Sequence, residues 1–297
     1  MQPDEYRKSE QALIRINIDD MLISLGWQNH SFARSLLGPI FRYPARQFAR
    51  QVLDYDRGVQ DLGLAGGARR LLAAYVKGFE VHGAENLPLS GPLLILSNHP
   101  GMVDTVALFA ALPRPDLRVL AAERPFLAAL PATRPYLFFV PENDGRSEVI
   151  RQTARYLRAG GAVLTFPGGH IDPDPRVMPG AAAALENWSP STGIFVHLAP
   201  DLQVLPVIVS GVIAAPSLRH PLTRLRRQSD DRQRLAATLQ ILAKVFLPNL
   251  WPVHVQVDIL PPIPGRELMA DPDPQAITRA AIERIRPYYQ RSDFVVP

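Results

Sequence analysis

Two polar residues, His99 and Asp104, are spaced so that they could carry out acid–base chemistry together. They lie in the segment NHPGMVD (residues 98–104), where a Pro-Gly turn can fold the carboxylate back onto the imidazole. A histidine with one ring nitrogen oriented by a carboxylate, and the other facing a cleft, is a general base for a hydroxyl proton. The alternative is that Asp104 only caps a helix and that His99 is an ordinary loop residue.

A second loop could bind a developing negative charge. The segment FPGGHIDPDP spans residues 166–175 and, like the first, comes directly after an apolar run. Its glycines, Gly168 and Gly169, let backbone N–H groups approach a ligand closely, as an oxyanion or a phosphate requires. A tight turn without any ligand is the alternative, because Pro-Gly-Gly also forms one.

Short apolar runs precede both segments and predict buried strands. Continuous apolar runs are typical of strands covered on both faces, and they occur at 93–97, 118–121, 136–140, 162–166 and 204–209. Helical stretches alternate with them, most clearly over 147–158. This alternation predicts an α/β fold, with a mostly parallel or mixed sheet and helices on both faces. Binding and catalytic sites in such folds lie at the carboxyl ends of the strands, which is where both polar segments are expected.

The rest of the chain divides into a helical N-terminal segment, residues 1–78, and the α/β domain, residues 79–297. An apolar stripe at helical spacing predicts a helix over 44–62, with Pro44 at its start and Gly63 at its end. A further helix is expected over 68–77. Strict alternation over 253–259 predicts an edge strand with one wetter face. Helices over 231–247 and 274–290 complete the prediction.

The composition excludes several classes of protein. The 297 residues are 47% hydrophobic and 20% charged, which excludes disordered and collagen-like chains. The chain has no cysteine, which excludes disulfide scaffolds, thiol nucleophiles and cysteine-ligated metal centres. The net charge of +4 is too small to indicate a nucleic-acid partner, so none is expected.

Taken together, the two segments resemble the PlsC-type lysophospholipid and glycerol-phosphate acyltransferases. Residues 81–104 (VHGAENLPLSGPLLILSNHPGMVD) look like the opening of that family, which carries a strand, then Asn-His, four residues and Asp. The order of the later segments also matches: YLFFVPENDGR, FPGGH, the turn at Pro179 and Gly180, and the strand that begins VLPV at 204–207. The resemblance covers residues 79–211.

The resemblance implies transfer of an acyl group from an acyl-CoA or acyl-carrier-protein thioester to a hydroxyl of a lysoglycerolipid-type acceptor. It implies that His99 is the general base and that Asp104 fixes its tautomer, with no acyl-enzyme and no metal or other cofactor. Backbone amides in the glycine loop are expected to stabilise the oxyanion. The predicted substrate-binding residues are Asn98, Arg146, Pro167, Gly168, Gly169 and His170.

Two departures from the family concern the acceptor half of the site. The family loop usually reads Phe-Pro-Glu-Gly, with a glutamate that engages the acceptor, and here Gly168 stands at that position. The arginine expected after the second motif's strand is displaced, and Arg146 is the nearest candidate; a solvated helix-start residue is the alternative. The acceptor, the acyl-chain length, the donor and the oligomeric state therefore stay open.

Other function classes fit some of the residues. Five potential metal ligands could assemble a metal-dependent phosphoesterase: His99, Asp104, His170, Asp172 and Asp174. A non-catalytic acyl- or lipid-binding homologue also fits, because the loop has lost its glutamate. A serine hydrolase is disfavoured, since the chain has no Gly-x-Ser-x-Gly motif.

The sequence predicts contact with a membrane surface without a membrane span. The longest apolar stretch, 193–216, is interrupted by polar residues and prolines, and the N-terminus does not read as a signal peptide. We expect a cytoplasmic protein that is peripheral on the inner face of the membrane. A basic run could reach anionic headgroups or CoA phosphates, with a solvated helix face as the alternative. The run comprises Arg219, His220, Arg224, Arg226, Arg227, Arg232 and Arg234.

Overall fold

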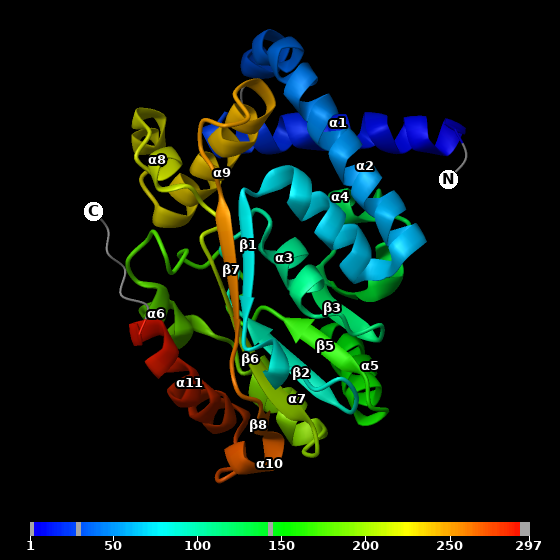
Figure 1. Cartoon of the computed structure of the whole chain (residues 1–297), viewed down its shortest axis with the longest axis vertical. Helices are drawn as coiled ribbons and strands as arrows, with labels where there is room; N and C mark the ends of the chain where they lie inside the picture. The colour runs from blue at the N-terminus through cyan, green and yellow to red at the C-terminus, as the bar shows by residue number, and fades with distance from the viewer. Residues whose placement is uncertain (1–2, 28–30, 142–144, 292–297) are drawn as a thin grey trace. The chain divides into compact units, whose positions relative to one another are not determined.

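The computed structural model describes residues 3–27, 31–141 and 145–291 (Figure 1). Contacts between residues divide the chain into two compact units, each described by itself below. The helical unit comprises Met1–Lys77, Arg124–Pro135 and Ile213–Val253. The sheet unit comprises Gly78–Glu123, Tyr136–Val212 and His254–Pro297. The division at residue 78 into a helical segment and an α/β domain stays a prediction.

The sheet unit is built on a mixed sheet with the order β1-β7-β6-β2-β5-β3-β4, in which β8 also pairs with β6. Strands β6, β2, β5, β3 and β4 are parallel to their neighbours in that run, and β7 is antiparallel to β6. The predicted fold class is confirmed. The strands are β1 (Gly78–His82), β2 (Leu93–Ser97), β3 (Leu117–Ala122), β4 (Leu137–Val140), β5 (Ala162–Thr165), β6 (Gln203–Ser210), β7 (His254–Ile259) and β8 (Ile263–Pro264).

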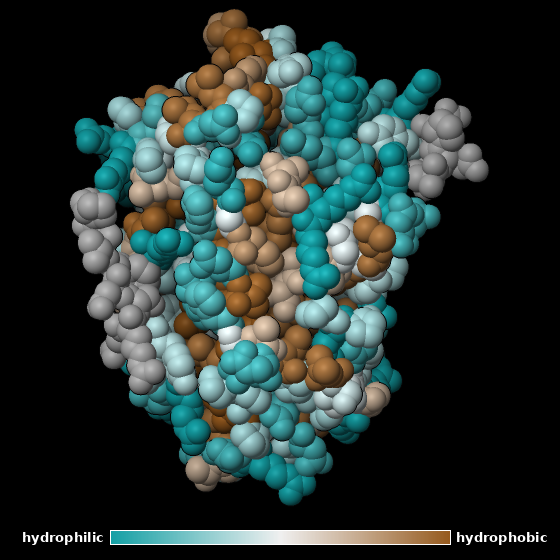
Figure 2. All heavy atoms as spheres, viewed as in Figure 1, coloured by the Kyte–Doolittle hydropathy of each residue, from teal (hydrophilic) through white to brown (hydrophobic). Residues whose placement is uncertain are grey.

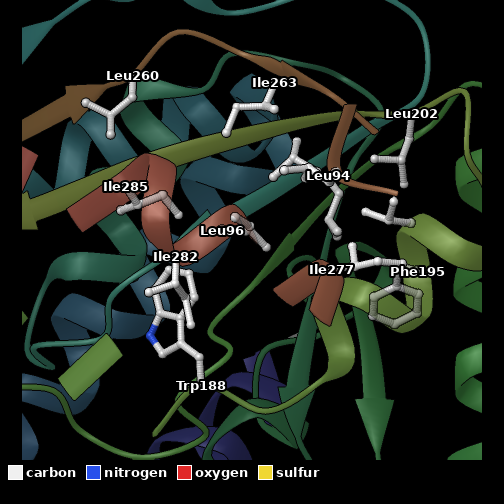
Figure 3. Packing of buried hydrophobic residues seen from close by; sticks show 14 of the residues in the cluster. Leu94, Leu96, Trp188, Phe195, Leu202, Leu260, Ile263, Ile277, Ile282 and Ile285 are labelled. Atoms are coloured by element: carbon white, nitrogen blue, oxygen red, sulfur yellow. The ribbon is translucent and has the colours of Figure 1, made fainter. Parts of the chain in front are cut away.

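The core of the sheet unit explains why β2 reads as a continuous apolar run. Leu94 and Leu96 point into a cluster with Trp188 and with α7 (Ser191–Leu198) and α11 (Pro274–Arg291), as Figure 3 shows. Leu93 and Ile95 alternate to the opposite face and are also fully buried. Each such side chain contributes about 2 kcal/mol through removal of apolar surface from water. Burial on both faces therefore fixes β2 at the centre of the sheet.

Two helices of the sheet unit, α3 and α5, pack against the strands that lead into the candidate site. Helix α3 begins just after β2 and contacts β6 and β7, and α5 contacts β4 and β5. The apolar stripe of α5 is buried at Thr153, Ala154 and Leu157, and its other side carries the charged residues. The remaining elements of the sheet unit are short. The helices are α3 (Asp104–Ala111), α5 (Arg146–Arg158), α6 (Ala181–Ala184) and α10 (Gly265–Leu268), with 3-10 turns η1 (Ala84–Asn86) and η3 (Leu185–Asn187).

The helical unit consists of α1 (Pro3–Leu25) packed on α2 (Ser31–Tyr75), with α9 (Ser229–Phe246) contacting both. Asp56 of α2 is buried and accepts hydrogen bonds from the backbone N–H groups of Ala132 and Thr133, at 3.1 and 2.8 Å. This carboxylate ties the 124–135 segment to α2. Within the described residues, no helix combines the length and apolar character needed to cross a bilayer. The shorter elements are α4 (Pro125–Ala128), α8 (Ala215–Leu218) and η4 (Pro221–Leu225), and η2 (Arg134–Tyr136) leads into β4.

The predicted helix start at Pro44 is wrong. Helix α2 begins at Ser31, and both Pro39 and Pro44 lie inside it. A proline inside a helix costs about 3 kcal/mol because it removes a backbone hydrogen bond and crowds the preceding turn. Packing of α2 along α1 outweighs that cost, which the local sequence does not reveal. The predicted break at Gly63 is confirmed, since its φ of 72° and ψ of 175° interrupt the helix.

The prediction that residues 253–259 form an edge strand is also wrong. Strand β7 is internal: it pairs in parallel with β1, from Gly78↔His254 to His82↔Asp258, and antiparallel with β6. Strand β1 forms the edge instead. The alternation itself is real, because β7 buries every second residue. An alternating pattern indicates that one face of the strand is open to solvent. It does not indicate whether the strand has a neighbour on each side.

Candidate active site

The end of β2 is anchored by the residue that precedes the candidate base. Asn98 is buried, its side-chain amide donates to the carbonyl oxygen of Val209, and its amide oxygen accepts the Val209 N–H, both at 2.8 Å. These bonds join the end of β2 to β6, so His99 begins from a fixed point at the carboxyl end of a central strand. Asn98 was predicted to bind substrate, and the structure instead commits both polar groups of its side chain to Val209.

Asp104 reaches His99 because the backbone between them reverses direction. Gly101 and Met102 both adopt positive φ angles, 87° and 57°, which turn the chain back at the start of α3. The Asp104 carboxylate then lies 2.8 Å, Oδ2 to Nδ1, from the imidazole of His99. Methionine rarely adopts this left-handed conformation, so the turn is held by its surroundings. The two residues whose spacing indicated acid–base chemistry are therefore in direct contact.

The Asp104 carboxylate is fixed by more than the histidine. Its side chain is fully buried; Oδ2 also accepts the Gly101 N–H at 2.6 Å. Its other oxygen, Oδ1, accepts the backbone N–H of Thr105 and, at 3.0 Å, the Thr105 hydroxyl. Donors to both of its oxygens fix the orientation of this buried carboxylate. Val103 occupies the N-cap position of α3, and Asp104 is its first residue. The Asp104 side chain accepts the N–H of Thr105 in the first turn and orients His99 at the same time.

The imidazole of His99 is held on one side and open on the other. Its Nδ1 is bound to Asp104, its ring packs against Phe166 at a centroid distance of 4.5 Å, and 34% of the side chain is exposed. The remaining nitrogen, Nε2, is the one that can exchange a proton with a substrate. Sequence reasoning missed Phe166 as a site residue, and its place directly after β5 was the signal for it.

The charges around His99 raise its pKa. Burial by itself lowers the pKa of the imidazole, but the charge of Asp104, its hydrogen bond and the charge of Asp172 together outweigh burial. The net shift is upward from the ordinary value near 6.5. A carboxylate partner that stabilises the imidazolium form increases the basicity of the ring, as a general base requires.

The glycine loop lies beside this histidine. The N–H of Gly169 donates to the carbonyl oxygen of Phe166 at 3.1 Å and closes a tight turn, with φ of 68° at Gly169. Pro167 is buried, and its carbonyl oxygen accepts the N–H of Ser189 at 3.0 Å. Among the described residues the N–H of Gly168 has no partner, and His170 is exposed. Of the two glycine amides, that of Gly168 is therefore the one left available to a ligand.

The same loop is joined to the segment that carries the candidate base. Asp172 accepts the backbone N–H of His99 at 2.8 Å through Oδ2, and its own N–H donates to the His99 carbonyl oxygen at 2.9 Å. Farther along, Asp174 accepts the N–H groups of Gly211 and Arg176 at 2.9 and 3.0 Å. The two polar segments singled out from the sequence thus form one site at the carboxyl ends of β2 and β5.

Comparison with known proteins decides to which family this site belongs. Residues 78–210, which contain both polar segments, match the family model described as Acyltransferase. These residues form an acyltransferase domain. The resemblance to acyltransferases indicated by the motifs is thereby confirmed over this stretch of the chain. No curated protein matches the chain.

Among solved structures, the chain is similar to the 1-acyl-sn-glycerophosphate acyltransferase PlsC from Thermotoga maritima. The two share 14% sequence identity, with a TM-score of 0.47, over 94% of this chain and 98% of that one.

Within the acyltransferase domain, the residues of the metal-site alternative are not arranged to bind a metal ion. Asp104, Asp172 and Asp174 direct their carboxylates at backbone N–H groups, and His170 is exposed. In the described part of the chain, no three histidine, aspartate or glutamate side chains are grouped to hold a metal ion. The geometry therefore does not assemble the ligand set that a metal-dependent phosphoesterase would need.

Arg146, the predicted phosphate-binding residue, follows β4, which is not a neighbour of β2 in the sheet. It is the first residue of α5, is exposed, and its Nε donates to the Pro141 carbonyl oxygen at 3.3 Å. Strand β4 precedes it, and β5 and β3 separate β4 from β2. At about 4.8 Å per strand, the ends of β2 and β4 lie about 14 Å apart. Arg146 therefore follows a strand three places along the sheet from β2, and its role in substrate binding stays a prediction.

Proposed function

We propose that this protein transfers a fatty acyl group from an acyl-CoA or acyl-carrier-protein thioester to a hydroxyl of a lysoglycerolipid-type acceptor. The observation that carries the proposal is the contact between His99 and the buried, fully hydrogen-bonded Asp104 at the end of β2, inside an acyltransferase domain. The pKa of the His99 imidazole is raised, and 34% of its side chain is exposed. No acyl-enzyme is needed, because the acceptor oxygen can attack the thioester directly.

In the proposed reaction, Nε2 of His99 takes the proton of the acceptor hydroxyl as the oxygen attacks the thioester carbonyl carbon. The resulting tetrahedral intermediate carries a negative oxygen. Collapse of the intermediate breaks the carbon–sulfur bond, and the imidazolium returns its proton to the departing thiolate. Asp104 keeps Nδ1 protonated and stabilises the imidazolium throughout, which is the role of the carboxylate in related triads.

The N–H of Gly168 is our candidate donor to the developing oxyanion. The loop contacts the His99 ring through Phe166, two residues before Gly168. Among the described residues the Gly168 N–H has no partner, whereas the N–H of Gly169 is used in the turn. A backbone amide fixed before the reaction stabilises a negative oxygen without reorganisation. Glycine at this position also keeps the amide accessible, because no side chain covers it.

An exposed apolar patch on the helical unit supports action at a membrane surface. Phe32, Leu36, Ile40 and Tyr43 recur on one face of α2, and the ring of Tyr43 lies 5.8 Å from that of Phe246 at the end of α9. Figure 2 shows hydrophobic atoms at the top of the view, over the first turns of α2. Exposed patches of this kind are typical of interaction sites. The apolar patch comprises Phe32, Leu36, Ile40, Tyr43, Phe246, Leu247 and Leu250.

The helical unit also carries a basic run, which supports binding to anionic headgroups. Arg226 is paired with Asp231 at 2.6 Å, and the Nδ1 of His220 accepts the Leu222 N–H, so these two serve the segment itself. The other members are exposed, namely Arg219, Arg224, Arg227, Arg232 and Arg234. Exposed arginines next to apolar side chains favour a bilayer with anionic headgroups. Location on the inner face of the membrane stays a prediction.

The direct test of the proposed function is thiol release from a long-chain acyl-CoA, measured with and without a panel of lysoglycerolipids. Wild type is expected to release thiol only with an acceptor. His99→Ala should lower kcat by about 10²- to 10⁴-fold, because a general base contributes that much. His82→Ala is the matched control and should keep wild-type activity, since His82 also contacts an aspartate but lies outside the site.

Two results would contradict the proposal. Acceptor-dependent release that persists in the His99→Ala variant would remove the base from the mechanism. Acyl-CoA binding without release, using any acceptor and with acyl-carrier-protein thioesters as the second donor, would identify a non-catalytic acyl-binding homologue instead.

The membrane proposal is tested with vesicles of phosphatidylcholine alone or mixed with phosphatidylglycerol. Ile40→Glu should weaken vesicle binding by about tenfold or more, because burial of one such side chain is worth about 1.5–3 kcal/mol. Leu62→Glu is the control, since Leu62 is equally exposed on the same helix outside the patch. Raising the salt should weaken binding to the anionic vesicles. Equal binding by both variants would contradict the proposed surface.

A further inference from the structure

The buried carboxylate of Asp172 holds the backbone of His99 from a different element of the fold. Its Oδ2 accepts the His99 N–H at 2.8 Å, and its own N–H donates to the His99 carbonyl oxygen at 2.9 Å. One residue, itself only 2% exposed, thus binds both backbone polar groups of His99. These bonds restrain the peptide groups on both sides of the histidine Cα, from which the imidazole projects.

Gly168 leaves the space that this carboxylate occupies. A Cβ at position 168 would lie 3.0 Å from Oδ1 of Asp172, which is closer than carbon and oxygen ordinarily pack. Any side chain at this position, including the glutamate usual in the family, would require the carboxylate to move. Gly168 and Asp172 are therefore a matched pair in this loop, and the departure at Gly168 has a local physical reason.

We propose that Asp172 is a positioning residue for the general base, fixing the His99 backbone from the volume that Gly168 leaves open. This inference rests on the proposed function of His99 and deepens it. Asp104 orients the ring through Nδ1, and Asp172 orients the backbone that carries the ring. His99 is thereby held by two carboxylates, at its ring by Asp104 at the start of α3 and at its backbone by Asp172 of the glycine loop.

The electrostatics of the pair agree with this arrangement. Burial raises the pKa of Asp172, and the opposing effects of the His99 N–H, His170 and the His99 ring do not cancel that rise. The Asp172 charge in turn raises the pKa of His99. Asp104 of α3 faces both groups, and Tyr289 of α11 faces Asp172; burial, and then the Asp172 charge, raise the pKa of that phenol.

Two substitutions separate the hydrogen bond from the charge. Asp172→Ala removes the acceptor of the His99 N–H and should lower kcat by about 10²-fold, since a displaced catalytic group costs about that much. Asp172→Asn keeps an oxygen acceptor and removes the charge, so it should retain most of kcat. Because the charge is gone, the acidic limb of kcat/KM should move to lower pH in the asparagine variant.

The pKa of His99 gives a readout that does not depend on activity. Titration of the histidine side chains by NMR, with the His99 signal assigned from the His99→Ala variant, should show a lower pKa in Asp172→Asn than in wild type. Asp174→Asn is the matched control: Asp174 is a buried aspartate of the same loop that binds Gly211 and Arg176. It should leave the pKa of His99 unchanged.

The pairing with Gly168 is tested by a double-mutant cycle. Gly168→Ala should lower kcat about tenfold in the wild-type background, because the added Cβ displaces the carboxylate. In the Asp172→Ala background the same change should cost less than about twofold, because the obstructed group is absent. Equal costs in both backgrounds would show that the two positions act independently.

The inference is overturned if Asp172→Ala keeps wild-type kcat, or if the pKa of His99 is the same in Asp172→Asn, Asp174→Asn and wild type. Either result leaves the proposed function standing, provided that His99→Ala is inactive. Failure of the proposed function is different, since wild type itself would then release no thiol with any acceptor. The NMR titration still tests the contact between Asp172 and His99 in that case.

Discussion

The sheet unit contains two histidine–aspartate pairs of nearly equal length, and they differ in how the carboxylate is held. His99 and Asp104 are 2.8 Å apart, and His82 and Asp258 are 2.9 Å apart. The Asp104 side chain is fully buried on backbone donors, whereas that of Asp258 is 28% exposed and accepts a side-chain donor, Gln256. The two pairs therefore share a contact distance, and only in the pair proposed to act in catalysis is the carboxylate buried and fixed by backbone donors.

The direction of the strands separates the two pairs further. His99 follows β2, and the carboxyl end of β2 lies beside those of its parallel neighbours β5 and β6. His82 ends β1, which runs parallel to β7 and hence opposite to that central group. Asp258 pairs with Ile208 near the carboxyl end of β6, but β7 and β1 lie on the other side of β6 from β2, outside the run of parallel strands. Active sites in open α/β sheets form at the carboxyl ends of the parallel strands, where His99 lies.

The largest expected difference between the pairs is in activity. Asp104→Asn should lower kcat by about 10²- to 10⁴-fold, because the amide cannot hold the imidazole in the required tautomer. Asp258→Asn should change kcat by less than about twofold, since surface substitutions away from a site are usually neutral. Acceptor-dependent thiol release measured side by side checks both. A comparable loss in the two variants would remove the distinction drawn between the pairs.

The pH dependence of activity sharpens the comparison. The pKa of His99 is raised above 6.5, and only the neutral ring accepts a proton, so kcat/KM should fall through a midpoint above pH 6.5 as the pH decreases. Asp104→Asn removes the charge that raises this pKa, so its residual activity should persist to lower pH. Profiles between pH 5 and 8.5 test this. A wild-type midpoint at or below 6.5 would argue against His99 as the base.

Much of the fold could be predicted because it depends on local patterns. β2 reads as a run of buried apolar residues, and the amphipathic stripe of α5 marks a helix within one residue of its observed start. Pro44 and β7 were predicted wrongly for one common reason. The position of each depends on a partner element distant in sequence, α1 for the helix and β1 for the strand, and periodicity carries no information about partners.

In the candidate site, likewise, contacts between residues close in sequence could be predicted and contacts between distant residues could not. The contact between His99 and Asp104 spans five residues and one turn, so spacing and residue type were enough to indicate it. The contact between His99 and Asp172 spans 73 residues and depends on β2 and β5 being neighbours. The sequence placed Asp172 in a metal-ligand set because residue types alone cannot show that a carboxylate faces backbone N–H groups.

Stability should distinguish the pairs by a smaller margin. Asp104→Ala leaves several buried donors without an acceptor, so we expect the free energy of unfolding to fall by about 2–4 kcal/mol. Asp258→Ala should change it by about 0.5 kcal/mol or less, because a partly exposed side-chain hydrogen bond contributes little. Urea denaturation at pH 7 measures both. Equal losses would mean that the burial of Asp104 adds nothing to the fold.

The smallest expected effect concerns Asp172 and reverses the usual direction for a buried aspartate. Its pKa is raised in the folded state, so folding favours the protonated carboxyl, and ionisation above the ordinary value near 3.8 costs stability. Asp172→Asn removes that cost while keeping the hydrogen bond to the His99 N–H. The Tm of the variant relative to wild type should therefore be higher at pH 7.5 than at pH 4. The opposite result is a relative Tm of the variant that falls as the pH rises. It would mean that the ionised carboxylate stabilises the fold, so that Asp172→Asn destabilises the protein as well as changing the pKa of His99.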